Sequence, residues 1–209
     1  MDCKVILFDF DDTLVETIKP KWAQHKYVAK TYYNKELHED EIRLHWGKPF
    51  SLLLKELYQT DKIEEATTYN IATRERFPKL LFPEMTNVIE ELKRRGKVLG
   101  IVTATSTCSL DYDFASLNIK KSYFDYVQTQ EDSQFHKPDP RVFEPTKAWL
   151  SEQGYTNSDV LYIGDALTDM KAAQEAGFNF IGTSTGLVSA KNFESLGVRA
   201  LHSLSDLLT

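Results

Sequence analysis

The 209-residue sequence lacks the features of several protein classes. Its two cysteines, Cys3 and Cys108, have no CxxC spacing, so we expect neither a disulfide framework nor a cysteine zinc site. It has no block of basic residues and a net charge of −6, which argues against nucleic-acid binding through phosphate contacts. The longest apolar runs, such as 98–102, are far shorter than the roughly 20 residues of a membrane-spanning helix. We therefore expect a cytoplasmic globular protein that binds neither nucleic acid nor a membrane.

The chain does contain short apolar segments separated by helical patterns. Strands are expected at residues 4–10, 97–103, 123–129, 160–164 and 179–182. Their apolar runs are nearly continuous, which indicates a parallel sheet covered on both faces. Between them, segments such as 85–95 and 168–176 have apolar residues at helical spacing and end at glycine. This alternation predicts an α/β fold with a doubly wound, Rossmann-like parallel sheet.

The connection between the first two expected strands is too long for a single crossover helix. Its apolar residues recur at helical spacing, and nothing between Glu16 and Leu81 has a strand pattern. We therefore expect an inserted α-helical cap domain of about four helices at residues 16–82. Residues 1–15 and 83–209 would form the α/β core domain.

Two acidic residues, Asp9 and Asp11, directly follow the first expected strand. In an open α/β sheet, ligands bind at the carboxyl ends of the strands. Two carboxylates in this place can hold a hard cation or divide the roles of nucleophile and proton donor. An acidic turn with an aspartate capping a helix gives the same short pattern, so this motif alone leaves both interpretations open.

Three further segments favour an active site. Thr103 places a hydroxyl at the end of the second strand, and Asp165 and Asp169 follow the strand at 160–164. Lys137 lies just before a helix that starts with proline. An anionic substrate beside several carboxylates needs positive charge, which Mg²⁺ and one lysine would supply. Each of these residues alone has an ordinary structural explanation, but their occurrence together at strand ends favours catalysis.

In this order, the segments resemble the motifs of the haloacid dehalogenase (HAD) superfamily, in the phosphoglycolate-phosphatase and β-phosphoglucomutase-like branch. DFDDTL is similar to its first motif, Thr103 to the second, Lys137 in HKPDP to the third and GDALTD to the fourth. The helical insert corresponds to the family's cap, so the resemblance covers essentially the whole chain. It implies a Mg²⁺-dependent phosphatase, monomeric or homodimeric, that acts on a small phosphorylated metabolite.

The resemblance also implies a role for each motif residue. Asp9 would be the nucleophile that forms an aspartyl-phosphate, and Asp11 would be the general acid and base. Mg²⁺ would be held by Asp9, the backbone carbonyl of Asp11 and Asp165, with Asp169 in its outer shell or orienting it. The residues expected to contact the substrate's phosphoryl group are Thr103, Ala104 and Lys137.

Several other positions carry weaker expectations. Asp12 stands where glycine is frequent in relatives, and we assign it no catalytic role. In the cap, Lys48 lies in a Gly-Lys-Pro loop and is expected to help select the substrate, although glycine and proline also commonly end helices. Cys108 is expected to be a buried, inert thiol, and Pro145 to kink a helix.

Three alternatives remain open at this point. A phosphotransferase of the β-phosphoglucomutase type would return the phosphoryl group to a sugar, so isomer formation instead of phosphate release would identify it. A signalling receiver domain also places acids, a hydroxyl and a lysine at strand ends, but it gives no reason for the long insert. A binding protein on an inactive phosphatase fold would lack a catalytic acid, whereas Asp9 and Asp11 are both present.

Overall fold

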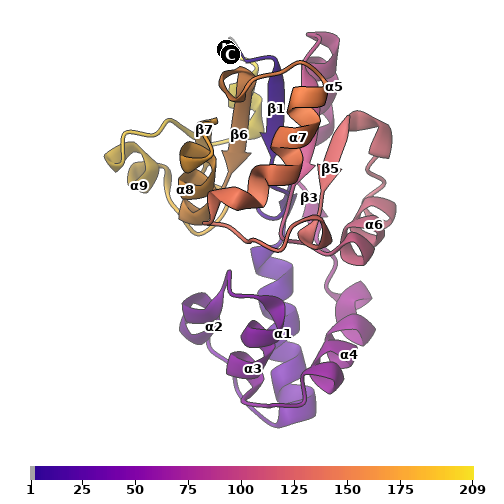
Figure 1. Cartoon of the computed structure of the whole chain (residues 1–209). Coiled ribbons are helices and arrows are strands. Elements are labelled where there is room, and N and C mark those ends of the chain that lie inside the picture. The colour runs from indigo at the N-terminus through magenta and orange to yellow at the C-terminus, as the bar shows by residue number, and fades with distance from the viewer. Residues whose placement is uncertain (1–2) are drawn as a thin grey trace. The chain divides into compact units, whose positions relative to one another are not determined.

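The computed structural model describes residues 3–209, which form two compact units. The core unit runs up to Glu16 and continues from Leu81, and the insert unit is Thr17–Leu80. In Figure 1 the insert has the purple and magenta colours of the lower residue numbers. These limits lie within two residues of the boundaries expected from the sequence. The functional division into a catalytic core and a cap stays a prediction.

A six-stranded parallel sheet with the order β5-β4-β1-β6-β7-β8 forms the centre of the core unit. Its strands are β1 (Val5–Phe8), β4 (Val98–Val102), β5 (Tyr126–Gln128), β6 (Val160–Gly164), β7 (Asn179–Thr183) and β8 (Ala200–Leu201). Phe8 at the end of β1 pairs with Ile101 and Ile163, so β1, β4 and β6 end at the same edge. The expected doubly wound α/β fold is confirmed, with β8 as an additional short strand.

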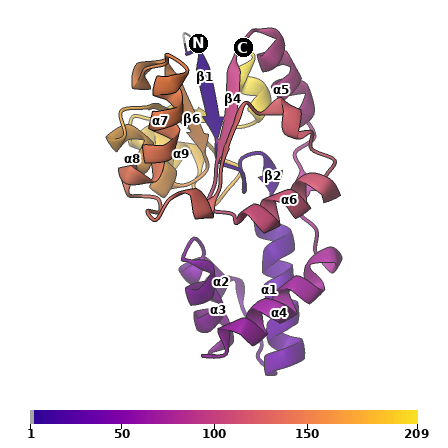
Figure 2. The same cartoon turned by 45° about the vertical axis from the view of Figure 1, so that its right-hand side comes forward.

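Helices cover both faces of this sheet, as Figure 2 shows. The helices of this unit are α5 (Met85–Arg94), α6 (Thr107–Ser116), α7 (Glu144–Glu152), α8 (Leu167–Glu175) and α9 (Ala190–Ser195). Ile6 and Phe8 of β1 pack in one apolar cluster with α5 and α6, whereas Val5 and Leu7 pack in another with α7 and α8. All four β1 side chains are therefore buried, which explains the uninterrupted apolar run in the sequence.

The chain changes direction across the sheet at β1. It passes from β1 to β4 and β5 on one side and then returns to build β6, β7 and β8 on the other. The crevice at the carboxyl ends of strands beside such a switch point is where open α/β sheets bind ligands. We therefore expect ligand-binding residues in the segments that follow β1, β4 and β6.

The insert contains four helices, as expected: α1 (Ile18–Tyr33), α2 (Glu39–His45), α3 (Phe50–Tyr58) and α4 (Ile63–Thr73). Two short strands, β2 (Val15–Glu16) and β3 (Leu80–Leu81), pair where the chain enters and leaves it. The expectation that no strand occurs there is wrong at these two ends, because two-residue strands are too short to produce an alternating pattern. Among the described residues, no helix is both long and apolar enough to span a membrane.

Two smaller expectations are also wrong. Pro145 does not kink a helix, because α7 begins at Glu144 and the proline occupies its first turn, where no backbone N–H is needed. Cys108 is exposed, because it lies in the first turn of α6 while Leu110 and Phe114 form the buried side of that helix.

A buried polar network lies inside the insert. His25 Nδ1 lies 2.7 Å from the Tyr58 hydroxyl, which donates to Asn70 Oδ1 at 3.2 Å. Gln24 Nε2 donates to the Asn70 carbonyl at 2.6 Å. Burial lowers the pKa of His25 to about 3, with a further contribution from the charge of Lys21. His25 is therefore neutral in the folded insert at physiological pH.

This network predicts that acid destabilises the insert. The pKa of His25 rises from about 3 to about 6.5 on unfolding, so the unfolded chain binds more protons between these pH values. The contribution of His25 to the free energy of unfolding should therefore fall as the pH is lowered from 7 to 4. Urea unfolding of the wild type and of His25→Gln at several pH values measures this contribution.

The matched control is His202→Gln, because His202 is exposed. We expect this variant to keep the pH dependence of the wild type, whereas His25→Gln should show a weaker loss of stability in acid. Equal pH dependence in all three proteins would contradict the assignment.

Candidate active site

Polar side chains follow three neighbouring strands of the sheet at one edge. Asp9 and Asp11 follow β1, Thr103 follows β4, and Asp165 follows β6. Asp169 lies in the first turn of α8, directly beyond Asp165. Parallel strands bring these segments together although they are far apart in the sequence. The acids and the threonine expected to form the site therefore follow strands that end at the same edge of the sheet.

Three of these acids form a tight cluster. Asp9, Asp165 and Asp169 each offer a carboxylate oxygen, and these oxygens lie within 4.8 Å of one another. Asp9 and Asp169 are buried, and Asp165 is partly buried. Carboxylates this close repel one another unless a proton or cation offsets their charge, and oxygen donors suit a hard divalent cation. The donor set therefore fits a metal ion.

Lys137 supplies positive charge to this cluster. Its Nζ lies 2.9 Å from Asp9 Oδ1 and 2.7 Å from Asp169 Oδ1. It also donates to the Tyr162 hydroxyl at 2.5 Å, and a longer contact of 3.2 Å reaches the Val102 carbonyl. The Tyr162 hydroxyl in turn donates to that same carbonyl at 2.8 Å. An ammonium group has three N–H donors, so these four acceptors already exceed its capacity.

Burial and charge shift the protonation of these groups. Burial raises the pKa of Asp9 to about 7; Lys137 opposes this shift, and the charges of Asp169 and Asp11 add to it. Burial, with Asp169 and Asp9, also raises the pKa of Asp165 well above its ordinary value. Burial alone would lower the pKa of Lys137, but Asp169 and Asp9 raise it well above its ordinary value. Lys137 therefore stays charged, while Asp9 and Asp165 need further positive charge to stay ionised at neutral pH.

Two glycines allow the acids to approach the sheet. A Cβ at Gly164, the last residue of β6, would lie 2.6 Å from Asp169 Cγ. A Cβ at Gly186 would lie 1.8 Å from Asp165 Oδ2. Any side chain at either position would displace a carboxylate of the cluster, so these positions require glycine.

The loop after β1 is fixed by a turn at Asp12. The backbone of Asp12 is left-handed, with φ +53°, and its N–H donates to the Val15 carbonyl at 2.7 Å. Its own carbonyl accepts a hydrogen bond from the Thr185 hydroxyl. Aspartate tolerates this conformation better than most residues, and glycine adopts it freely. The left-handed backbone explains why glycine suits this position.

The other expected substrate contacts lie in two places. Thr103 is buried, and its Oγ1 accepts the backbone N–H of Thr105 at 3.1 Å, which leaves the Thr103 hydroxyl hydrogen able to donate to a ligand. Ala104 is exposed in the same turn. Lys48 belongs to the insert, where its Nζ lies 2.8 Å from His45 Nδ1. The catalytic, metal-binding and substrate-binding roles of all these residues stay predictions.

Comparison with known proteins identifies the family. The sequence pattern of the haloacid dehalogenase-like hydrolases matches residues 6–183, which include the four motifs described above. The chain belongs to this family. It is therefore an enzyme, a phosphohydrolase of the HAD type, as the sequence analysis expected.

Individual relatives agree with this assignment. The chain is 29% identical over 198 residues to a protein of Clostridium perfringens named as a pyrophosphatase PpaX, covering 93% of this chain and 88% of the relative. A Thermotoga maritima structure named as a β-phosphoglucomutase has a TM-score of 0.80 at 22% identity, covering 98% and 96% of the two chains. A Haemophilus somnus structure named as a phosphoglycolate phosphatase has a TM-score of 0.83 at 20% identity, covering 100% and 97%. At these identities, the two structures show that the chain shares their fold.

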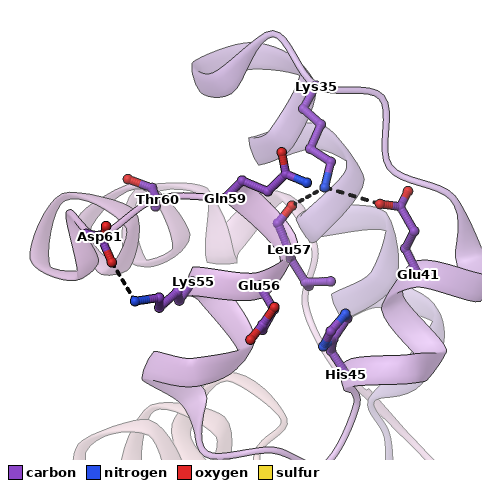
Figure 3. Close-up of a pocket in the computed structure, with 9 residues that line it drawn as sticks. All are labelled: Lys35, Glu41, His45, Lys55, Glu56, Leu57, Gln59, Thr60 and Asp61. Carbon is purple, nitrogen blue, oxygen red and sulfur yellow. Dashed lines mark hydrogen bonds and ion pairs between the residues drawn. The ribbon is translucent and has the colours of Figure 1, made fainter.

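The insert of this HAD hydrolase also has a pocket of about 380 Å³, shown in Figure 3. Its charged side chains largely pair with one another, since Lys35 Nζ lies 3.2 Å from Glu41 Oε1 and Lys55 Nζ lies 2.6 Å from Asp61 Oδ1. None of the three clustered acids, Asp9, Asp165 and Asp169, lines it. The acid cluster is therefore the candidate site for the chemistry of the enzyme.

Two residues beside the cluster, Tyr162 and Thr105, were not expected from the sequence. Tyr162 is fully buried in β6, and its sequence neighbours are apolar, so it resembles an ordinary core residue. Its hydroxyl was the available signal, because a buried tyrosine hydroxyl needs a hydrogen-bond partner. Thr105 contacts Asp11 through its side chain, a contact that depends on how the turn after β4 folds.

The position of Tyr162 predicts a stability effect in this HAD hydrolase. Tyr162→Phe removes a hydrogen bond to the charged Lys137, and we expect the free energy of unfolding to fall by about 1–2 kcal/mol. Urea unfolding measures this change. Tyr126→Phe is the matched control: the Tyr126 hydroxyl donates to an uncharged partner, Gln128 Oε1 at 3.1 Å, so the loss of stability should be smaller. An equal or larger loss in Tyr126→Phe would contradict a special role for the Tyr162–Lys137 bond.

Proposed function

We propose that the chain is a Mg²⁺-dependent phosphatase that hydrolyses a small phosphorylated metabolite through an aspartyl-phosphate on Asp9. The observation that carries this proposal is the contact of Lys137 with Asp9 inside the cluster of three acids. A buried carboxylate beside one cation and a metal-binding cluster is suited to attack a phosphoryl group, because its charge and that of the substrate can both be offset.

In the first step, a carboxylate oxygen of Asp9 attacks phosphorus and the bond from phosphorus to the leaving-group oxygen breaks. Asp11 gives its proton to that oxygen. The Thr103 hydroxyl and the Lys137 ammonium donate to the phosphoryl oxygens, where negative charge is greatest in the transition state. The products of this step are the free alcohol or phosphate leaving group and an acyl phosphate on Asp9.

In the second step, Asp11 is a carboxylate and takes a proton from water. The water oxygen attacks phosphorus, and the bond between Asp9 and phosphorus breaks, which releases inorganic phosphate and restores both acids. Mg²⁺, held by Asp9, Asp165 and the carbonyl of Asp11 with Asp169 beside them, would offset negative charge on the phosphoryl group.

Pyrophosphate is the first substrate to test, because several curated relatives that match the chain are named as pyrophosphatases. The sequence alone did not point to a phosphoanhydride. Lys48 in the insert stays a proposed contact to the leaving group. A screen that measures phosphate release from pyrophosphate, p-nitrophenyl phosphate and a panel of sugar and carboxylic-acid phosphates, each with Mg²⁺, tests the proposal.

Phosphate release that disappears in Asp9→Asn would support the phosphatase. Isomerisation of a sugar phosphate without phosphate release would favour the phosphotransferase. Absence of both activities across the panel would overturn the proposed function.

A further inference from the structure

A second hydroxyl from the turn after β4 contacts the proposed general acid. Thr105 Oγ1 donates to Asp11 Oδ2 at 2.5 Å, although 94 positions separate the two residues. Both residues belong to the core unit. This hydrogen bond is short and has a charged acceptor when Asp11 is ionised, which makes it one of the stronger types. It therefore fixes the Asp11 carboxyl relative to the end of β4.

The backbone on both sides of Thr105 is anchored. Its N–H donates to Thr103 Oγ1 at 3.1 Å, and its carbonyl accepts the N–H of Gln130 at 3.1 Å. The next residue, Ser106, caps α6 with its side chain. Because these hydrogen bonds hold the main chain, the Cα and Cβ atoms of Thr105 have a fixed position beside Asp11.

The Thr105 hydroxyl can keep its contact with Asp11 in both steps. A hydroxyl can donate to an ionised carboxylate and can also accept from a protonated carboxyl. The contact at Oδ2 can therefore hold the Asp11 carboxyl in one orientation while Asp11 gives and takes up a proton.

We propose that Thr105 is a positioning residue that holds the Asp11 carboxyl in the orientation from which it exchanges protons with the leaving group and with water. The inference rests on the proposed function, because it acts through the proton-transfer role of Asp11. Thr105 is distinct from Thr103, which belongs to the second HAD motif and is expected to contact the phosphoryl group itself. The test must therefore separate proton transfer to the leaving group from phosphoryl binding.

Substrates whose leaving groups differ in basicity separate proton transfer from phosphoryl binding. A weakly basic leaving group such as 2,4-dinitrophenolate departs without a proton, whereas phenolate or an alkoxide needs one from the general acid. Loss of Asp11 orientation should therefore slow the first step only for basic leaving groups. A merely structural role for Thr105, or a role in holding the phosphoryl group, would slow all substrates alike.

The variants are Thr105→Val, which keeps the shape but removes the hydroxyl, and Thr105→Ser, which restores it. Thr107→Val is the matched control, since the partners of the Thr107 hydroxyl are Thr129 at 2.8 Å and Glu131 at 3.0 Å. The value of kcat/KM is measured with 2,4-dinitrophenyl, phenyl and alkyl phosphates. Asp11→Asn is measured on the same substrates as a reference for the loss of the general acid.

We expect Thr105→Val to lower kcat/KM about tenfold or more for phenyl and alkyl phosphates and less than about threefold for 2,4-dinitrophenyl phosphate. Thr105→Ser should stay within about threefold of the wild type on all three, and Thr107→Val should show no dependence on the leaving group. If Thr105→Val does not fold by circular dichroism, Thr105→Ala makes the same test.

Equal losses on all substrates, or a serine variant as impaired as the valine variant, would overturn the inference. The proposed function fails separately: the wild type would then release no phosphate, or Asp11→Asn would show no dependence on the leaving group. A leaving-group dependence in Asp11→Asn that is missing in Thr105→Val would refute the role of Thr105 alone.

Discussion

Asp9→Asn should lower phosphate release by about 10⁴-fold or more, because the amide oxygen is a far weaker nucleophile than a carboxylate and cannot form the acyl phosphate. The variant should stay folded, since burial already disfavours the charged form of Asp9 and raises its pKa to about 7. Phosphate release by the purified variant, measured with a sensitive dye or coupled assay, gives the loss. Urea unfolding shows whether the fold is kept.

Asp111→Asn is the matched control for this prediction. Asp111 is exposed on α6, where its Oδ1 pairs with Lys121 Nζ at 2.6 Å, and the same chemical change there should leave activity within about twofold. Retention of more than about a tenth of wild-type activity by a folded Asp9→Asn would rule out Asp9 as the nucleophile.

Removal of divalent cations should abolish activity, and Mg²⁺ should restore it. Asp9, Asp165 and Asp169 place three carboxylate oxygens within 4.8 Å, and one lysine does not offset them together with a phosphate substrate. Ca²⁺ should not substitute, since its longer bonds and looser coordination alter the position of the phosphoryl group. Activity after dialysis against EDTA, before and after each cation is added, measures the effect. Full activity in the dialysed enzyme would contradict a metal role.

The pH dependence of stability gives a second measurement of the same site. The pKa of Asp9 is about 7 when folded and about 3.8 when unfolded, so the folded state binds more protons between these values. In the metal-free protein, the Asp9 contribution to stability should therefore fall as the pH rises from 4 to 7. Metal ions compete with protons for these carboxylates, so Mg²⁺ should raise Tm more at pH 8 than at pH 5.5. An equal shift at both values, or the same shift in Asp165→Asn, would contradict this.

Much of the secondary structure of the core could be predicted, because it follows from the pattern of apolar and polar residues within each segment. β1 is buried on both faces, so its four residues are all apolar, and the acids begin where the strand ends. The helix at Met85–Arg94 has one apolar face and a clear glycine end, and its expected limits differ from the structure by one residue. Such features depend on neighbouring residues alone, and a single sequence shows them.

The parts that could not be predicted depend on contacts between distant segments. The bond of Thr105 to Asp11 needs the turn after β4 to lie beside the loop after β1. The polar partner of Tyr162 is known only once Lys137 is placed over β6. The exposure of Cys108 could not be predicted for the same reason. The sequence does not show which side of α6 faces the sheet, and the structure shows it because Phe114 packs in the core.

Lys137 already has more acceptors than N–H donors, and this has a consequence for product release. A phosphoryl oxygen that binds Lys137 must replace one of its present acceptors, so binding would exchange a hydrogen bond and not add one. The longest of these contacts, to the Val102 carbonyl at 3.2 Å, is given up at the lowest cost, because that carbonyl keeps its hydrogen bond from Tyr162. Under the proposed function, Lys137 would regain this contact when inorganic phosphate leaves, which would favour departure of the product.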